Sequence, residues 1–319
     1  MSAPFKFGYL IPTRDAVMNA PDGRADIKRM LELAVKAEQQ GFDAVWIGDS
    51  ILAKPRFEPL TTLAAIAALT QRVQLGTAVY LTPLRHPVPL AHMVGNLDLL
   101  SGGRLIFGIG TGPGTSTVRD EFASCGIDFK KRGALQEEGL RIMKGLWTGK
   151  PFTFEGKHFQ LRDALLHPLP GRAGGPPVLL AGASERPLRR VVRFADGWLP
   201  ISHDAAEYSR DWKKIEEICK EERRDPATLL RVMYITLNVN RDSARAEQET
   251  QAFVESYYGP SYKLVVPTQA ICSGTPARCA EFIRSFAQAG CSEFVVRFSA
   301  KEQEPQMQRM LSDVVPLLR

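Results

Sequence analysis

The sequence has few cysteines, and none of them stands at the spacing of a metal site. Its five cysteines are an odd number without any C-x-x-C pair, so neither a disulfide framework nor structural zinc is indicated. We expect reduced thiols packed in the interior. No pair of histidines with a carboxylate has ligand spacing either, and we therefore expect no catalytic metal.

Long apolar runs and a strong charge imbalance are also missing. The longest apolar stretches end well before the roughly 20 residues that cross a bilayer. The chain of 319 residues has 41 Lys and Arg against 35 Asp and Glu, a formal net charge of +6. These charges are scattered, so we expect neither a membrane nor a nucleic acid as partner. Because the chain begins without a secretory leader pattern, we expect a cytoplasmic protein.

Strand-like and helix-like segments alternate almost throughout the chain. The strand-like segments are apolar without polar alternation, which is typical of parallel strands covered on both faces. The sequence therefore predicts an α/β fold, a (β/α)8 TIM barrel formed by one domain over residues 1–319, in preference to an open doubly wound sheet. The expected strands are Phe5–Pro12, Phe42–Asp49, Val73–Leu81, Arg104–Gly112, Pro176–Ser184, Asp196–Ser202, Arg231–Asn240 and Glu293–Ser299. The helices expected between them include Asp26–Gln40, which Gly41 ends, one from about Pro87 to Leu100, and one between Asn240 and Glu293.

One segment breaks this alternation. Lys150–Pro170 has two short aromatic runs on either side of "EGK", which is typical of an exposed hairpin, and a proline-rich return follows. We interpret residues 150–176 as an insertion within the barrel, after its fourth helix. A linker between domains is not favoured, because the barrel cannot close without the strands that follow.

The C-terminal ends of the strands form the active-site face of such a barrel, which selects candidate residues. Asp49 and Ser50 follow the second strand, and His203 follows the sixth. Asp and Ser also cap helices and turns, and capping by Asp204 is an alternative explanation for the surroundings of His203. Catalytic and capping roles both stay open for these residues.

Two loops with small residues are candidates for ligand binding. Gly108–Thr115, "GIGTGPGT", allows close approach of a ligand to the backbone. It is not a phosphate loop, because no Gly-Lys-Ser/Thr follows and the next helix is expected only about twenty residues later. Ala181–Arg186, "AGASER", precedes a helix whose N-terminus offers free N–H groups to an anion. Arg132 or Arg186 could add charge there.

The third strand contains small residues in "LGTAVYL", which includes Gly76. This pattern indicates either a bulge against a flat ligand or the packing of a barrel interior. Both interpretations are kept.

Several segments, in order and spacing, resemble the bacterial luciferase-like monooxygenases. That superfamily includes FMN-dependent two-component monooxygenases and coenzyme F420-dependent oxidoreductases. The segments are GFDAVWIGDS, PLTTLAAIAALTQRVQLGTAV, RHPVPLAHMVGNLDLLSGGRLIFGIGTG, LWTGKPFTFEGKHFQL and RRVVRFADGWLP. The resemblance covers most of the chain and implies a TIM barrel whose mouth binds an isoalloxazine or deazaflavin ring. In relatives a non-proline cis peptide supports the ring, and that position falls here on Gly76 to Val79, with Ala78–Val79 as the expected bond.

The resemblance also implies which residues hold the phosphate of the cofactor. The phosphate-binding residue at the end of the fourth strand is often Arg in luciferases and is Thr111 here. Arg132 and backbone amides would therefore contribute more of the phosphate binding. The implied cofactor residues beyond the third strand are Thr111, Gly112, Arg132, Gly182, Ala183 and Ser184.

The end of the second strand departs from the family. Many relatives have an acidic residue followed by a catalytic His, whereas this chain has Asp49 followed by Ser50. Serine cannot act as a general base near neutral pH without a partner. Asp49 could orient the ring or, in a desolvated site, transfer a proton. Chemistry that depends on an imidazole at this position is not expected.

From the resemblance we expect a flavin-dependent oxidoreductase. The favoured function is a two-component monooxygenase that uses oxygen and reduced FMN, supplied by a separate flavin reductase, on a small organic substrate. The alternatives are hydride transfer with coenzyme F420 and no oxygen, or a non-catalytic flavin-binding barrel. Relatives commonly dimerise, so a homodimer is expected. The substrate cannot be identified from the sequence.

Overall fold

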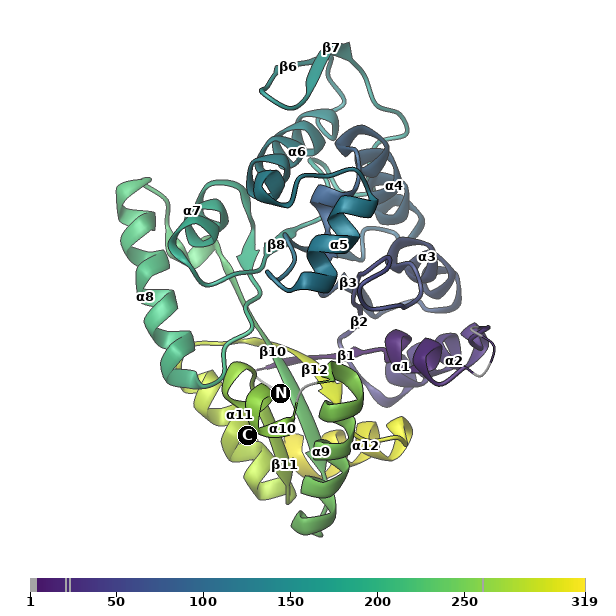
Figure 1. Cartoon of the computed structure of the whole chain (residues 1–319). Coiled ribbons are helices and arrows are strands. Elements are labelled where there is room, and N and C mark those ends of the chain that lie inside the picture. The colour runs from purple at the N-terminus through teal and green to yellow at the C-terminus, as the bar shows by residue number, and fades with distance from the viewer. Residues whose placement is uncertain (1–4, 21, 23, 260, 319) are drawn as a thin grey trace.

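Eight parallel strands close into a barrel in the computed structural model, which describes residues 5–20, 22, 24–259 and 261–318 (Figure 1). The last barrel strand pairs with the first, which closes the ring. In barrel order the strands are β1 (Lys6–Leu10), β2 (Ala44–Ile47), β3 (Gln74–Thr77) continued by β4 (Tyr80–Leu81), β5 (Leu105–Gly110), β8 (Val178–Leu180), β9 (Gly197–Trp198), β10 (Leu230–Val239) and β12 (Glu293–Phe298). The predicted (β/α)8 barrel and its eight strands are confirmed.

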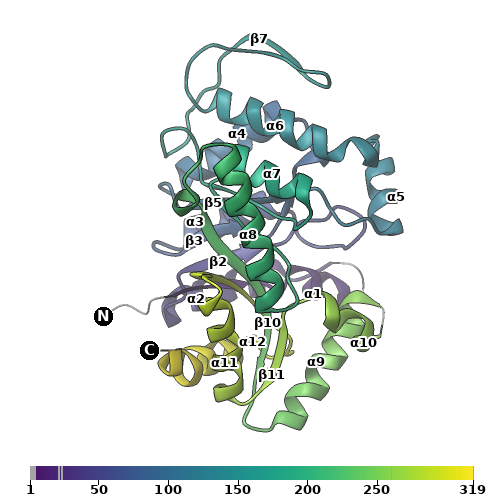
Figure 2. The ribbon, with the colours of Figure 1, turned by 90° about the vertical axis from the view of Figure 1, so that its left-hand side faces the viewer.

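Helices surround the barrel, and most of the apolar core lies between them and the strands. Short helices α1, α5 and α10 lie on one side, the right-hand side of Figure 2. The helices are α1 (Thr13–Met18), α2 (Ile27–Gln40), α3 (Pro59–Leu69), α4 (Pro87–Leu100), α5 (Ser116–Ser124), α6 (Arg132–Leu146), α7 (Glu185–Phe194), α8 (Ala205–Glu221), α9 (Ser243–Tyr258), α10 (Tyr262–Val265), α11 (Pro276–Gln288) and α12 (Gln303–Arg309).

Helix α2 shows how local sequence fixes these elements. The Asp26 side chain accepts the Lys28 N–H at its N-terminus, and Gly41, with φ 102°, ends it in the left-handed conformation. Met30 and Leu33 belong to its buried face. The predicted helix over residues 26–40 is confirmed.

Trp46 of β2 fills the middle of the barrel. A Cβ at Gly8 of β1 or at Gly76 of β3 would collide with its indole ring. The small residues on both neighbouring strands therefore make room for one large side chain, which is 2% exposed. Barrel packing was one of the two interpretations kept for the third strand, and it accounts for Gly76.

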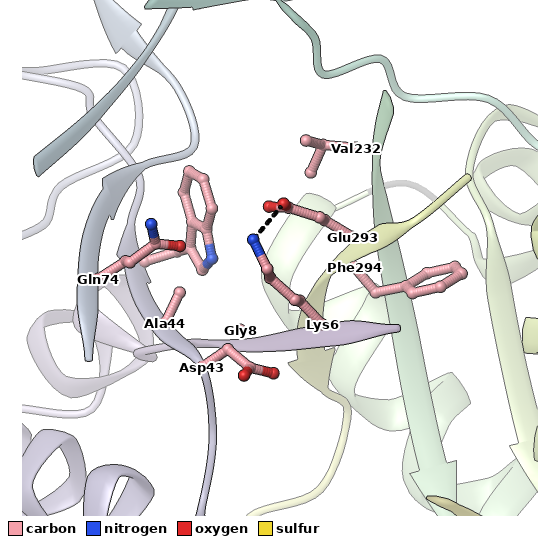
Figure 3. A pocket seen from close by; sticks show the side chains of 9 residues that line it. Lys6, Gly8, Asp43, Ala44, Gln74, Val232, Glu293 and Phe294 are labelled. Carbon is pink, nitrogen blue, oxygen red and sulfur yellow. Dashed lines mark hydrogen bonds and ion pairs between the residues drawn. The ribbon is translucent and has the colours of Figure 1, made fainter. Parts of the chain in front are cut away.

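An ion pair closes the end of the barrel where the strands begin (Figure 3). Lys6 Nζ lies 2.9 Å from the Glu293 carboxylate. Beside the pair is a cavity of about 10 Å³, lined also by Asp43 and Gln74, which is room for about one water molecule. Ligand access is therefore expected at the opposite end, which we call the barrel mouth.

The insertion forms an antiparallel hairpin of β6 (Phe152–Glu155) and β7 (Gln160–Ala164). It lies at the periphery, outside α4 and α6 (Figures 1 and 2). The carboxylate of Glu138 in α6 accepts the N–H groups of Lys157 and His158 at 3.0 and 2.9 Å, which fixes the turn. The predicted hairpin is confirmed.

Two parts of the sequence-based prediction were wrong. Helix α5 begins at Ser116, directly after the glycine-rich loop, and not about twenty residues later. Its mostly polar sequence hides an apolar face of Val118 and Phe122, both buried. Between Asn240 and Glu293 the sequence predicted one helix, whereas β11 (Ile271–Gly274) and α11 also lie there, and β11 pairs with β10 outside the ring of eight.

Three expectations concern the chain as a whole. The five cysteines are free, and four of them are buried. None of the helices in the described part of the chain combines the length and apolar character needed to cross a membrane. The expectation about a leader rests partly on residues 1–4, which lie outside the described residues.

Candidate active site

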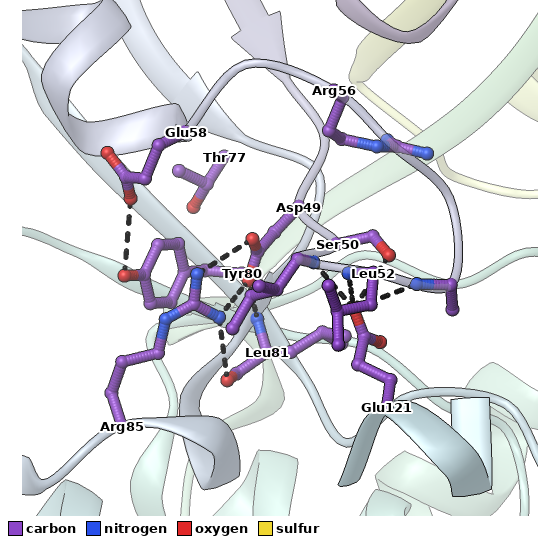
Figure 4. Close-up of polar contacts among 12 residues, drawn as sticks. Asp49, Ser50, Leu52, Arg56, Glu58, Thr77, Tyr80, Leu81, Arg85 and Glu121 are labelled. Atoms are coloured by element: carbon purple, nitrogen blue, oxygen red, sulfur yellow. Dashed lines mark hydrogen bonds and ion pairs between the residues drawn. The ribbon is translucent and has the colours of Figure 1, made fainter. Parts of the chain in front are cut away.

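Asp49, at the end of β2, is buried and ion-paired (Figure 4). Its Oδ1 accepts a hydrogen bond from Arg85 Nη2 at 2.9 Å, and its Oδ2 accepts the Leu81 N–H at 2.8 Å and a second Arg85 N–H. Burial raises the pKa of the Asp49 carboxyl above its ordinary value, and Arg85 opposes that shift. The carboxylate thus ties the end of β2 to β4 and to the turn that leads into α4.

Ser50 is buried, and its hydroxyl both donates and accepts a hydrogen bond. Its Oγ donates to Glu121 Oε1 at 2.9 Å and accepts the Lys54 N–H at 2.8 Å. The same Glu121 oxygen accepts the N–H groups of Ile51, Leu52 and Ala53. Glu121 is 1% exposed. One buried carboxylate from α5 therefore holds the loop of residues 48–58, which we call the β2–α3 loop.

The Ala78–Val79 peptide bond is cis, at the position that the resemblance implied. It lies between β3 and β4 in the third barrel strand. Gly110 of β5 faces this segment, since a Cβ there would lie only 2.7 Å from Val79 Cγ2. A Cβ at Gly48 would lie 3.5 Å from the Ala78 carbonyl oxygen. These residues form one wall of the barrel mouth, which we call the β3 wall.

Arg132, the first residue of α6, and Arg190, in the middle of α7, lie close together. The Arg132 guanidinium stacks 3.8 Å from the ring centre of Phe129, and its Nη1 donates to the Phe129 carbonyl at 2.9 Å. Arg190 Nη1 would lie 2.9 Å from a Cβ at Gly133, so it packs against the start of α6. The Nε atoms of Arg132 and Arg190 are both buried without a hydrogen-bond partner. Two buried donors are therefore available to an anion.

The loop between β8 and α7 leads into the helix that carries Arg190. Gly182 has φ +116°, and Ser184 occupies the N-cap position of α7 without a side-chain capping bond. Because β8 pairs with β5, the loop lies next to Thr111 and Gly112, which follow β5. With Ala183 between them, these residues and the two arginines make up the candidate phosphate site. The structure places Thr111 and Gly112 beside the β8–α7 loop, and the binding of a phosphate by these residues stays a prediction.

Four cationic side chains meet around Tyr257 of α9. The Arg14 guanidinium lies 4.4 Å from the centre of the Tyr257 ring, and that of Arg297 lies 5.0 Å from it. Arg56 Nη2 donates to the Tyr257 hydroxyl at 3.3 Å. Lys54 also lowers the pKa of Tyr257 by its charge. We call Arg14, Lys54, Arg56 and Arg297 the cation cluster.

No carboxylate neutralises the cation cluster among the described residues. Arg297 is 4% exposed and donates to neutral groups, Thr236 Oγ1 at 3.0 Å and Tyr258 Oη at 2.7 Å. The ion pairs in the described part of the chain include none of the four cations. Nε and Nη1 of Arg14 are buried without a partner. Burial lowers the pKa of Lys54. The cluster therefore has charge and donors available to an anionic ligand.

His203 stands apart from these groups. Its Nδ1 lies 2.8 Å from Glu207 and its Nε2 lies 2.8 Å from Asp204, both at the start of α8. The Asp204 side chain also accepts the Glu207 N–H, as an N-cap. The polar contacts of His203 thus run to its own helix.

Sequence reasoning did not single out Tyr257, Arg14, Arg190 or Glu121. Arg14 follows the end of β1, where the rule for barrel strands could have selected it. Tyr257 and Glu121 lie within helices whose local sequence gives no sign of the site. Their roles depend on contacts with the β2–α3 loop. Arg56, which contacts Tyr257, lies 201 residues before it, and Ser50, which contacts Glu121, lies 71 residues before it.

Comparison with known proteins adds independent evidence. A model of the family described as "Luciferase-like monooxygenase" matches residues 5–293. The F420-dependent glucose-6-phosphate dehydrogenase of Kineococcus radiotolerans is 29% identical, over 99% of this chain and 98% of that protein. An F420-dependent secondary alcohol dehydrogenase in complex with an F420–acetone adduct superposes with a TM-score of 0.82 and 20% identity over 99% of both chains. A monooxygenase from Streptomyces bottropensis gives 0.81 and 20% over 98% of this chain and 100% of that one. At such identities the structural likenesses show a shared fold.

Proposed function

The chain belongs to the luciferase-like monooxygenase family of flavin- or F420-dependent oxidoreductases, and we propose that it transfers hydride between coenzyme F420 and a small organic substrate with an anionic group. The observation that carries the choice of cofactor is the full-length similarity to F420-dependent dehydrogenases. The sequence alone favoured reduced FMN with oxygen. The curated relatives support the F420 alternative better than that first preference.

The candidate phosphate site fits either cofactor, since both carry a phosphate on a ribityl chain. The unpartnered Nε atoms of Arg132 and Arg190 are donors for it, and the uncapped N-terminus of α7 at Ser184 adds backbone N–H groups. The β3 wall, with Ala78 and Val79, would support the ring. When bound, the deazaflavin supplies a two-electron acceptor or donor of hydride.

The cation cluster supports the anionic substrate. Buried or half-buried cations without a counter-charge are costly, and an anionic group between them relieves that cost. The relatives are named as dehydrogenases of glucose 6-phosphate, a phosphorylated sugar, which agrees with such a site. Arg56 of the cluster packs against Gly48 of the β3 wall. A phosphate or carboxylate of the substrate near Arg14 and Arg297 would therefore hold the reacting part of the substrate beside that wall.

We assign supporting roles to the polar residues after β2. Asp49 fixes β4 through Leu81 and Arg85, and Ser50 fixes the β2–α3 loop through Glu121. Both would orient the mouth without exchanging protons. We assign His203 a structural role at the start of α8, where its ring is hydrogen-bonded to Glu207.

Titration of the protein with F420 and FMN, each oxidised and reduced, tests the choice of cofactor. Anaerobic reduction of F420 with glucose 6-phosphate as the probe tests hydride transfer. Oxygen-dependent turnover with reduced FMN, and none with F420, would reverse the assignment. Binding of a cofactor without turnover in either assay would favour the non-catalytic barrel.

Arg132→Ala tests the candidate phosphate site. A charge-assisted hydrogen bond contributes about 1.5–3 kcal/mol, so F420 affinity should fall about 10- to 100-fold. Lys131→Ala is the matched control, because Lys131 is the adjacent, exposed cation and should change affinity less than about threefold. Equal effects of the two variants would contradict a specific site at Arg132.

A further inference from the structure

When hydride leaves or reaches the carbon of an alcohol or carbonyl group, another group must take or give the proton on the oxygen. The residues that the resemblance to the family suggested do not offer a side chain that is free to do so. The Asp49 carboxylate is bound to Arg85. The Ser50 hydroxyl donates to Glu121, and His203 lies between two carboxylates of its own helix region. The proton must therefore be handled elsewhere in the mouth.

We propose that Tyr257 of α9 is the catalytic residue that exchanges this proton with the substrate oxygen. This inference rests on the proposed hydride transfer. Tyr257 is half-buried, and its hydroxyl has one hydrogen bond, from Arg56. The Arg56 guanidinium that bonds this hydroxyl also packs against Gly48, where a Cβ would lie 3.5 Å from the Ala78 carbonyl oxygen. The Arg56 guanidinium thus connects the Tyr257 hydroxyl to the β3 wall.

The charges around Tyr257 suit this role. Burial by itself raises the pKa of its phenol, but the cation cluster outweighs burial and lowers that pKa to about 7. A proton acceptor is most effective when its pKa lies near the working pH. The titratable and charged groups that face Tyr257 are Arg14 of α1, Lys54 and Arg56 of the β2–α3 loop, Tyr258 of α9, Tyr234 of β10 and Arg297 of β12.

The neighbouring Tyr258 and Tyr234 are less suited to this role. The Tyr258 hydroxyl accepts from Arg297 at 2.7 Å and donates to Gln269 Oε1 at 2.7 Å, so both of its directions are used. Burial raises the pKa of Tyr234 well above its ordinary value. The Tyr257 hydroxyl has one long hydrogen bond, 3.3 Å from Arg56 Nη2.

The step conserves atoms and electrons. In the direction of alcohol oxidation, the O–H bond of the substrate breaks and its proton passes to the Tyr257 phenolate oxygen. The adjacent C–H bond breaks, and hydride, with its electron pair, passes to the oxidised deazaflavin. The substrate becomes a carbonyl compound. In the reverse direction the Tyr257 phenol gives the proton back.

The first measurement needs no cofactor. Tyrosinate absorbance of the protein is recorded from about pH 5 to about pH 10, for the parent and for Tyr257→Phe. The parent should show a neutral phase with an amplitude of one of the seven tyrosines, and Tyr257→Phe should lack it. Inorganic phosphate, as a probe anion for the cation cluster, should move the midpoint upward in the parent, because it offsets the positive charge. Absence of a neutral phase in the parent would overturn the proposal even if the variant failed to fold.

The second measurement is the pH profile of F420 reduction with glucose 6-phosphate. Tyr257→Phe should lower kcat by about 10²- to 10⁴-fold and leave KM within a few-fold, and it should abolish the rise in kcat/KM near pH 7, the parameter that reports the free protein. Tyr262→Phe, on the neighbouring α10, is the control and should keep the parent profile. Parent-level kcat with an unchanged profile in Tyr257→Phe would overturn the assignment of Tyr257 alone. Absence of hydride transfer in the parent would instead overturn the proposed function, and this inference with it.

Discussion

Removal of the Glu121 carboxylate should loosen the β2–α3 loop and destabilise the whole barrel. Oε1 of Glu121 accepts the Ser50 hydroxyl at 2.9 Å and three successive backbone N–H groups. Glu121→Ala removes the acceptor for all of them at once. It also leaves a space in a place that is 1% exposed.

The expected cost follows from which donors water can reach after the substitution. The Ser50 hydroxyl is buried, and a buried donor that loses its partner costs about 1–3 kcal/mol. Ile51 and Leu52 are 43% and 56% exposed, so water can partly replace the carboxylate at their N–H groups, at about 0.5–1 kcal/mol each. Together these losses give about 2–5 kcal/mol for Glu121→Ala.

Urea unfolding followed by circular dichroism measures this loss. Asp120→Ala is the matched control, because Asp120 is an exposed carboxylate in the same helix and should change the free energy of unfolding by no more than about 0.5 kcal/mol. Glu121→Gln, which keeps an oxygen acceptor, should lie between the two. A free energy of unfolding for Glu121→Ala within about 1 kcal/mol of the parent would refute the inference that this carboxylate holds the loop.

Two further predictions concern the barrel interior and its pH dependence. Gly8→Ala should lower the free energy of unfolding by about 1–3 kcal/mol, because its Cβ would collide with the indole of Trp46; Gly114→Ala, where the nearest atom to a Cβ is 3.9 Å away, should be nearly neutral. Tyr257 has a pKa of about 7 in the folded chain against an ordinary 10.0, so the unfolded state binds more protons between those values and stability rises with pH there. The difference in urea midpoint between the parent and Tyr257→Phe should therefore shift in favour of the parent from about pH 7 to about pH 9, and a constant difference would contradict the lowered pKa.

The sequence predicted those elements whose cause is local. Helix α4 has the bounds that the sequence predicted, Pro87 to Leu100, because proline at its first position and a run of apolar residues mark it clearly. The apolar strands were recognised for the same reason. Helix α5 was missed because its buried Glu121 looks like a surface residue, and its partner, the Ser50 hydroxyl, lies 71 residues earlier.

The candidate site was predictable in position but not in its partners. The rule for barrel strands selected Asp49, yet the Arg85 that neutralises it lies 36 residues away. The resemblance selected Arg132 and Ser184, but the unpartnered Nε of Arg190 depends on how α7 packs on α6. No periodicity or spacing in the sequence encodes such distances, since they arise from the closure of the barrel.

The serine at position 50 is compatible with a working enzyme because of what the loop after it carries. Ser50 is buried against Glu121, so an imidazole in its place would need space that the α5 carboxylate occupies. The loop fixed by this contact places Lys54 and Arg56 beside Tyr257, and Arg56 bonds its hydroxyl. The residue that departs from the family pattern and the tyrosine that we assign to proton transfer are therefore linked through one loop. Loss of the Ser50–Glu121 contact should accordingly move the neutral titration of Tyr257 upward, since Arg56 and Lys54 would lie farther from its phenol.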